Sequence, residues 1–222
     1  MRNRRIRATV IAFNIIFVAV IIIFAPLSVY LFSLPNYFSL YEEHNVTEEL
    51  ERDELLKITG NLINFFRNTE PIQRFEPSGD VPAFTDDQIS HLEDVRVLTN
   101  RLLIIFYSSL VLFILSSLLL ISGRADFFRS MGIIFVGAAS TVAAILLMLY
   151  LGSQNFWIFF EQFHLIFFPQ GNYTFPADSL LITLFPIGFF YQFFLRLVTA
   201  SGIILVIVLG LGILFLNIKR LK

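Results

Sequence analysis

Two of the three histidines lie just outside the ends of long apolar segments. His91 precedes the apolar segment at residues 102–121, and His164 follows the one at residues 131–151. Imidazole is the side chain that changes charge near neutral pH, so it can accept or release a proton during a reaction. His44, in contrast, stands in an acidic stretch away from any apolar segment. We therefore expect His91 and His164 to carry any chemistry.

A carboxylate stands near each of these two histidines. Asp94 follows His91 by three positions and Glu161 precedes His164 by three, so each pair shares a face if its segment is helical. A neighbouring carboxylate fixes the tautomer of an imidazole and raises its basicity. The simpler interpretation makes each histidine an interfacial residue packed among Phe rings with its polar edge in water. A joint site and two separate interfacial residues both fit the spacing.

The composition predicts an integral membrane protein. Apolar residues make up 56% of the 222 residues, 27 residues are Phe and none is Cys, which lies outside the range of soluble domains. The lack of cysteine excludes disulfides, thiol nucleophiles and Cys-ligated metals. About 20 apolar residues cross a bilayer, and four segments are long enough. They are residues 8–30, 102–121, 131–151 and a segment that ends at Leu216.

The basic residues predict how these segments are oriented. Arginine or lysine clusters precede the first span, separate the second from the third and follow the fourth, so both termini are expected in the cytoplasm. The parts outside then include residues 33–101, with 14 Asp and Glu against 6 Lys and Arg. The expected fold is an all-α membrane protein with four transmembrane helices and a mainly helical extracytoplasmic cap. Its parts are the N-terminus with the first span (1–32), the cap (33–101), the second span (102–121), a cytoplasmic loop (122–130), the third span (131–151), an aromatic-rich external or interfacial segment (152–196), and the fourth span with the C-terminus (197–222).

The cap is expected to contain at least two helices. Thr47 followed by acidic residues predicts a helix start, and the prolines between Pro71 and Pro82 predict irregular structure after that helix. Thr85-Asp86-Asp87-Gln88 matches a capping box, which predicts a second helix that carries His91 toward the second span.

The other external segment is dense in aromatic residues. Fifteen of the 35 Phe, Tyr and Trp residues lie between Phe156 and Phe194, as is typical of an interfacial layer. Counting back about 20 residues from Leu216 puts Arg196 at the outer membrane boundary. We expect Arg196 to meet Glu161, Asp94 or a lipid head group there.

At these residues the chain resembles the bacterial lipoprotein intramolecular transacylases, called Lit. The resemblance rests on three segments and spans nearly the whole chain. The sequence contains no phosphate loop, nucleophile elbow, His-Glu-x-x-His pair or basic nucleic-acid patch. Tyr173 stands where we expect Trp in relatives. The matching segments are Tyr41-Glu42-Glu43, His91-Leu92-Glu93-Asp94-Val95, and Phe163-His164 through Phe168 to Asn172.

The resemblance implies a reaction, a location and a set of site residues. The sn-2 acyl chain of a diacylglyceryl-modified lipoprotein would move to the amino group of its own N-terminal cysteine and give the lyso form. His164 would act as the base, and His91 would protonate or polarise the leaving oxygen or the oxyanion, although these roles could be exchanged. The enzyme would lie in the bacterial cell membrane with its site at the extracytoplasmic face, among membrane lipids, and would need no cofactor, nucleotide or nucleic acid. The supporting residues would be Asp94, Glu161, Arg196, Asn172, Trp157, Phe163 and Tyr173.

Two other functions fit parts of the pattern. His91, Asp94, Glu161 and His164 together could bind zinc and activate water, as in a metal-dependent membrane hydrolase. A non-catalytic transporter or scaffold is the other alternative, but no span carries an ionisable residue at its middle.

Overall fold

The computed structural model describes residues 2–74, 83–121 and 124–218, which form helices and connecting turns without a strand. The predicted all-α fold is therefore confirmed for this part of the chain. The chain divides into two compact units. We call the first unit the bundle and the second the cap. The bundle comprises Met1–Ser28, Leu102–Leu151 and Leu197–Lys222, and the cap comprises Val29–Arg101 and Gly152–Arg196.

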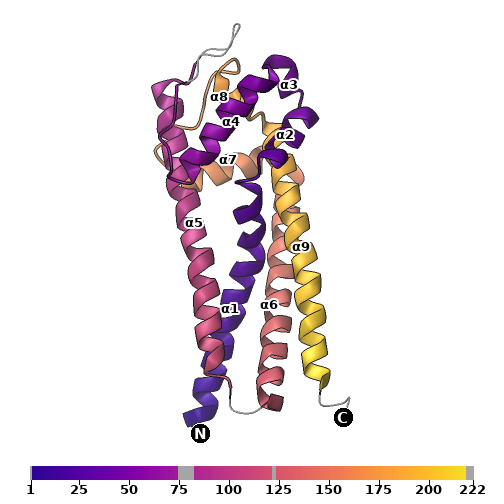
Figure 1. Cartoon of the computed structure of the whole chain (residues 1–222). Helices are drawn as coiled ribbons and strands as arrows, with labels where there is room; N and C mark the ends of the chain where they lie inside the picture. Colours follow the sequence, from indigo (N-terminus) through magenta and orange to yellow (C-terminus); the bar gives the residue numbers. More distant parts are fainter. Residues whose placement is uncertain (1, 75–82, 122–123, 219–222) are drawn as a thin grey trace. The chain divides into compact units, whose positions relative to one another are not determined.

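Within the described residues, four helices are long and apolar enough to cross a membrane, as the sequence predicted. They are α1 (Arg2–Tyr30), α5 (Asp86–Leu118), α6 (Arg124–Gly152) and α9 (Ile187–Asn217). In the bundle, the start of α1 and the end of α9 lie at the same end of the helices (Figure 1). An even number of crossings requires this arrangement.

Small residues and a few polar contacts join the helices of the bundle. Gly137 of α6 approaches Ile15 of α1 so closely that a Cβ atom at Gly137 would lie 2.8 Å from the Ile15 Cδ1 atom. Ser116 of α5 donates a hydrogen bond of 2.7 Å to the Asn14 side-chain oxygen of α1. Lipid is as apolar as a leucine side chain, so close backbone approach and interhelical hydrogen bonds hold such helices together. The buried core consists of Val18, Ala19, Ile22, Leu120, Met131, Ile134, Ala138 and Val142.

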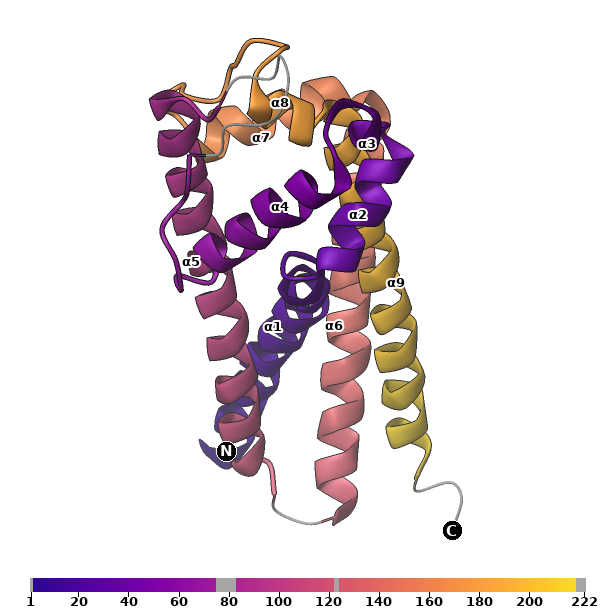
Figure 2. The same cartoon turned by 45° about the horizontal axis from the view of Figure 1, so that its top comes forward.

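The cap is built from short helices and the outer parts of two long ones (Figure 2). Its helix α4 (Arg52–Phe66) buries one apolar face, with Leu55, Ile58 and Leu62 at 1% exposure or less. Arginines stack on phenylalanine rings at both ends of α4, with Arg52 5.4 Å from the Phe38 ring and Arg96 4.3 Å from the Phe65 ring. The other cap elements are α2 (Leu34–Glu43), α3 (Val46–Glu49), η1 (Ser153–Asn155), α7 (Phe156–Phe167), α8 (Leu180–Leu184), residues 86–101 of α5 and residues 187–196 of α9.

The helix predicted to start at Thr47 is divided in two. The short helix α3 ends before Leu50, whose backbone is extended at φ −132° and ψ 139°, and α4 begins at Arg52. Leu50 is 3% exposed, so the burial of its side chain outweighs the local helical preference of the acidic residues around it. Pro71 is non-helical as expected, whereas Pro77, Gly79 and Pro82 lie outside the described residues.

The helix that carries His91 continues without a break into the second span. Thr85 caps it, since its side-chain oxygen accepts a hydrogen bond of 3.3 Å from the Gln88 backbone N–H. The 33 residues of α5 extend about 50 Å at 1.5 Å per residue. The predicted capping position and the predicted helix through His91 are both confirmed, and the structure adds that this helix is continuous with the second span.

The third span ends in a turn that starts a separate helix. Asp126–Phe167 forms one apolar stretch of 42 residues, which would be about 63 Å long as a single helix, twice the hydrocarbon thickness. The 3-10 turn η1 interrupts it, and the Asn155 side chain accepts a hydrogen bond of 3.3 Å from the Ile158 N–H at the start of α7. Helix α7 thereby belongs to the cap and not to the span.

Gly212 provides a test of the close helix packing in the bundle. A Cβ atom at Gly212 would lie 3.0 Å from the backbone nitrogen of Val136 on α6, whereas one at Gly210 meets nothing within 4 Å. We expect Gly212→Ala to destabilise the protein by about 1 to 3 kcal/mol because the backbone must shift, and Gly210→Ala to be nearly neutral. Thermal unfolding of both variants in detergent measures the difference. Equal midpoints for the two variants would contradict this packing.

Candidate active site

The two histidines come together from separate helices of the cap. The His91 ring of α5 and the His164 ring of α7 have centroids 6.0 Å apart and planes 24° from parallel. Each residue is only 7% exposed. One small reacting group beside the rings can therefore reach a nitrogen atom on each within hydrogen-bond distance.

A backbone carbonyl fixes the tautomer of His164. Its Nδ1 atom lies 2.7 Å from the carbonyl oxygen of Phe160, one turn earlier in α7. A carbonyl oxygen can only accept a hydrogen bond, so Nδ1 must carry the proton when the ring is neutral. The Nε2 atom of His164 then keeps its lone pair and can act as a base.

Asp94 forms its hydrogen bonds with the loop after α7 and none with His91. Its Oδ2 atom accepts a hydrogen bond of 2.7 Å from the Gln170 side-chain nitrogen and another of 2.7 Å from the Asn172 side-chain nitrogen. The carboxylate therefore orients Asn172, whose side chain lies next to His91 and interacts with its ring. The sequence suggested a direct pair between Asp94 and His91, and it gave no sign of Gln170, because loop residues follow no helical or strand period.

Burial keeps both imidazoles neutral at neutral pH. Loss of solvent and, to a smaller extent, the nearby His164 lower the pKa of His91 to about 4, against the raising effects of Asp94 and the Asn172 side chain. Loss of solvent also lowers the pKa of His164 below 6.5, against the raising effect of the hydrogen bond to the Phe160 carbonyl. Two neutral rings offer both N–H donors and nitrogen lone pairs.

Aromatic rings enclose the pair. Phe168, 2% exposed, contacts both histidines, with its centroid 4.9 Å from His91 and 5.5 Å from His164. Tyr173 and Phe163, both expected at the site, lie 4.9 Å and 5.4 Å from the His164 ring. Phe160 and Phe175 complete the enclosure, at 4.2 Å from His164 and 5.6 Å from His91. Trp157, also expected there, is 67% exposed at the start of α7.

Glu161 does not orient His164 in this structure. It is exposed on α7 while His164 is buried, and the described residues show no hydrogen bond or ion pair between them. Residues three apart on a helix are neighbours but differ in direction by about 60°, so burial of one leaves the other in contact with solvent or lipid.

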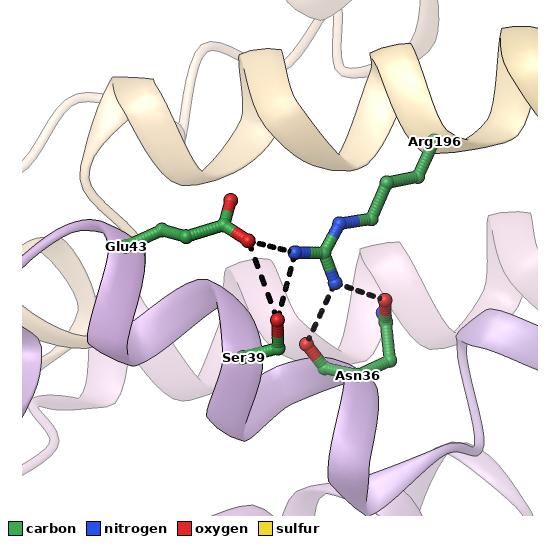
Figure 3. Close-up of polar contacts among 4 residues, drawn as sticks. All are labelled: Asn36, Ser39, Glu43 and Arg196. Carbon is green, nitrogen blue, oxygen red and sulfur yellow. Dashed lines mark hydrogen bonds and ion pairs between the residues drawn. The ribbon is translucent and has the colours of Figure 1, made fainter.

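Arg196 binds α2 and not the acidic residues expected from the sequence. Its guanidinium donates hydrogen bonds to the Asn36 side-chain oxygen at 2.8 Å and to the Ser39 hydroxyl at 3.0 Å, and it forms an ion pair with Glu43 (Figure 3). These three partners are spaced by three and four residues, so they share one face of α2. The contact joins α2 to the outer part of α9. The expectation that Arg196 meets Glu161 or Asp94 was wrong, because nothing local in the sequence indicates which helix packs beside it.

The residues considered as zinc ligands do not converge. In the described parts of the chain, no three or more His, Cys, Asp or Glu residues form a group that could hold a metal ion. His91 and His164 face each other, but Asp94 is bonded to two amides and Glu161 is exposed. The geometry gives no support to the metal-dependent hydrolase.

Comparison with known proteins places this chain in a family. Residues 10–190 match the family model described as lipoprotein intramolecular transacylase Lit. An uncharacterized protein of Aquifex aeolicus is 28% identical over 170 residues, which cover 75% of this chain and 74% of that protein. The structure of the membrane-integral lipoprotein intramolecular transacylase Lit of Bacillus cereus superposes with a TM-score of 0.72 at 16% identity, covering 100% of this chain and 99% of that one. A variant of the same protein with one histidine replaced by arginine gives a TM-score of 0.72 at 16% identity, covering 99% and 94% of the two chains.

The depressed pKa of His91 predicts a dependence of stability on pH. Because the folded-state pKa, about 4, lies below the ordinary 6.5, the unfolded chain binds more protons between these values, and folding stability falls as pH falls through this window. We expect His91→Phe to remove this contribution, so its stability should fall less than that of the wild type between pH 6.5 and 4. Thermal unfolding of both proteins between pH 6.5 and 4 measures this loss of stability. If the stability of both proteins falls equally with pH, His91 is not a buried neutral imidazole.

The network around Arg196 predicts that lysine cannot replace it. A lysine ammonium is a single point of charge and cannot bond Asn36, Ser39 and Glu43 in the geometry of the planar guanidinium. We expect Arg196→Lys to destabilise the protein by about 1 to 2 kcal/mol through lost hydrogen bonds. Arg101→Lys, at an exposed position of the cap, is the matched control. Equal thermal unfolding of both variants would show that the network contributes nothing.

Proposed function

The chain belongs to the lipoprotein intramolecular transacylase family Lit and is a membrane-integral acyltransferase, and we propose that it transfers the sn-2 acyl chain of a diacylglyceryl lipoprotein. The acceptor is the amino group of the N-terminal cysteine in the same lipoprotein, and the product is the lyso form. One observation supports this proposal most strongly, namely two buried imidazoles whose ring centroids lie 6.0 Å apart. The transfer converts an ester to an amide within one molecule.

His164 is the general base in this mechanism. The amine nitrogen attacks the acyl carbon, a C–N bond forms, and the nitrogen gives up a proton to Nε2 of His164. The hydrogen bond from Nδ1 to the Phe160 carbonyl supports this role, since it leaves Nε2 unprotonated in the neutral ring. The same proton then passes from Nε2 to the glycerol oxygen as the C–O bond breaks. Atoms and charge balance without any further reactant.

His91 polarises the acyl group. With a pKa near 4 it stays neutral at neutral pH, so its ring N–H can donate a hydrogen bond to the oxyanion that forms on the acyl oxygen. Such a donor in a site without water stabilises the developing charge strongly. Asp94 acts through Asn172 to orient this ring. This division of roles gives each histidine the task that its surroundings favour.

The aromatic side chains around the two histidines favour the cyclic transition state of the transfer. The attacking amine and the ester are joined through the cysteine and the glycerol, so the transition state is a medium ring that a free chain rarely adopts. Walls of Phe168, Tyr173 and Phe163 around the two histidines hold both groups close together. Restricting the substrate in this way can remove several kcal/mol from the barrier, on the order of magnitude known for oriented reactants.

The proposed location is the bacterial cell membrane with both termini in the cytoplasm. The basic residues at the two chain ends and between the second and third spans support this orientation. The common end of α1 and α9 in the bundle agrees with it (Figure 1). The cap and the two histidines then face the outside, where acyl chains in the membrane meet the polypeptide of a lipoprotein.

Substitution of the histidines tests the mechanism. We expect His164→Ala to lower the turnover of a diacylated lipopeptide by about 10² to 10⁴-fold through loss of the base. His91→Ala should lower it by about 10² to 10³-fold through loss of the oxyanion donor. Mass spectrometry of the lipopeptide distinguishes lyso, diacyl and hydrolysed products directly.

His44→Ala is the matched control, because His44 lies at the end of α2 beside Gly188 and not in the site. Its turnover should equal that of the wild type. Unchanged conversion in both His164→Ala and His91→Ala, with correctly folded protein, would remove this mechanism.

A further inference from the structure

The hydrogen bond to Asp94 fixes the orientation of the Asn172 amide. Its side-chain nitrogen donates to Oδ2 of Asp94 at 2.7 Å, and the Gln170 side-chain nitrogen donates to the same oxygen at 2.7 Å. A carboxylate oxygen only accepts hydrogen bonds, so the amide nitrogen of Asn172 must face Asp94. The amide oxygen must then point the other way, toward the side on which the His91 ring lies.

That oxygen is buried; it interacts with the His91 ring but makes no full hydrogen bond among the described residues. The side-chain oxygen of Gln88, a residue 1% exposed that lies one turn before His91 on α5, also has no hydrogen-bond partner there. A buried acceptor without a donor costs about 1 to 3 kcal/mol. These two amide oxygens are acceptors that the described part of the protein does not fully satisfy, which favours a ligand that brings N–H groups.

We propose that Asn172 binds the attacking amine of the substrate through its side-chain oxygen, as a second contact beside His164. This inference rests on the proposed transacylase function and adds a residue that touches the reacting atoms. The reacting end of a diacylglyceryl cysteine holds two esters and a thioether, all of which only accept hydrogen bonds. Its donors are the terminal amino group and the first peptide N–H, and only the amino group must reach His164.

Two contacts define the direction of the attacking lone pair. A primary amine has two N–H bonds, one directed to Nε2 of His164 and the other to the Asn172 oxygen. With both N–H bonds held, the nitrogen lone pair has one remaining direction, toward the acyl carbon. Asp94 and Gln170 contribute by keeping the Asn172 amide from turning. The C–N bond then forms, and the proton goes to His164 as described above.

The test compares two unreactive ligands on wild type and variants. Both are lipopeptides with ether bonds in place of the esters, so no acyl transfer occurs. One keeps the cysteine amino group and the other has hydrogen in its place. We expect Asn172→Leu, similar in volume, to lower the wild-type preference for the amine ligand about tenfold, the size of one charge-assisted hydrogen bond. The preference that remains in this variant comes from the contact with His164.

Asn100→Leu is the matched control, because Asn100 lies on the cap part of α5 and bonds Asn68 away from the site. It should keep the full preference of the wild type for the amine ligand. The ligand without the amine also reports folding, since a folded Asn172→Leu binds it as the wild type does. If that variant binds neither ligand, Asn172→Ala takes its place in the comparison.

The outcome separates this inference from the transacylase mechanism. If Asn172→Leu or Asn172→Ala loses turnover but keeps the full preference for the amine ligand, Asn172 acts only on His91 and the proposal is overturned. If the preference falls about tenfold only in the Asn172 variants, the proposal holds. The mechanism itself fails on a different result, namely unchanged turnover in His164→Ala, which the two unreactive ligands do not measure.

Discussion

The removal of two imidazoles from water is the constraint on which the site depends. Each ring is 7% exposed, and burial is the largest cause of the lowered pKa of each. In water near neutral pH a fraction of such rings would be protonated, and two cations at 6.0 Å would repel each other. Burial among Phe168, Tyr173 and Phe163 removes that charge and leaves neutral rings, one with a free lone pair and both able to donate.

The cap produces this arrangement by turning the chain at defined points. Helix α5 runs without interruption through His91, so this ring is held by a rigid element. The turn at η1, with its Asn155 cap, starts α7 as a separate helix, whose only buried residue is His164. The loop after α7 then returns Gln170 and Asn172 to Asp94 of α5. Two helices and one loop therefore define the site together.

The sequence predicts what depends on length, composition and local spacing. The four apolar helices, the Thr85 cap and a helix through His91 were predicted from these signals alone. The contacts that depend on tertiary packing were not predicted. Arg196 bonds α2, Glu161 is exposed, and the buried Leu50 breaks an expected helix. His91 and His164 were identified by their places beside the spans. The contacts from Asp94 to Asn172 and from Asn172 to His91 could not be predicted, because they depend on how the loop after α7 folds.

In this site both rings are neutral, and His164 carries its proton on Nδ1. Nitrogen NMR of ¹⁵N-labelled histidine in the lipid-embedded protein at pH 7 measures this directly, with His44→Ala removing the third signal. We expect a protonated Nδ1 and an unprotonated Nε2 for His164, and one protonated nitrogen for His91. An imidazolium signal from either ring, or an unprotonated Nδ1 on His164, would contradict it.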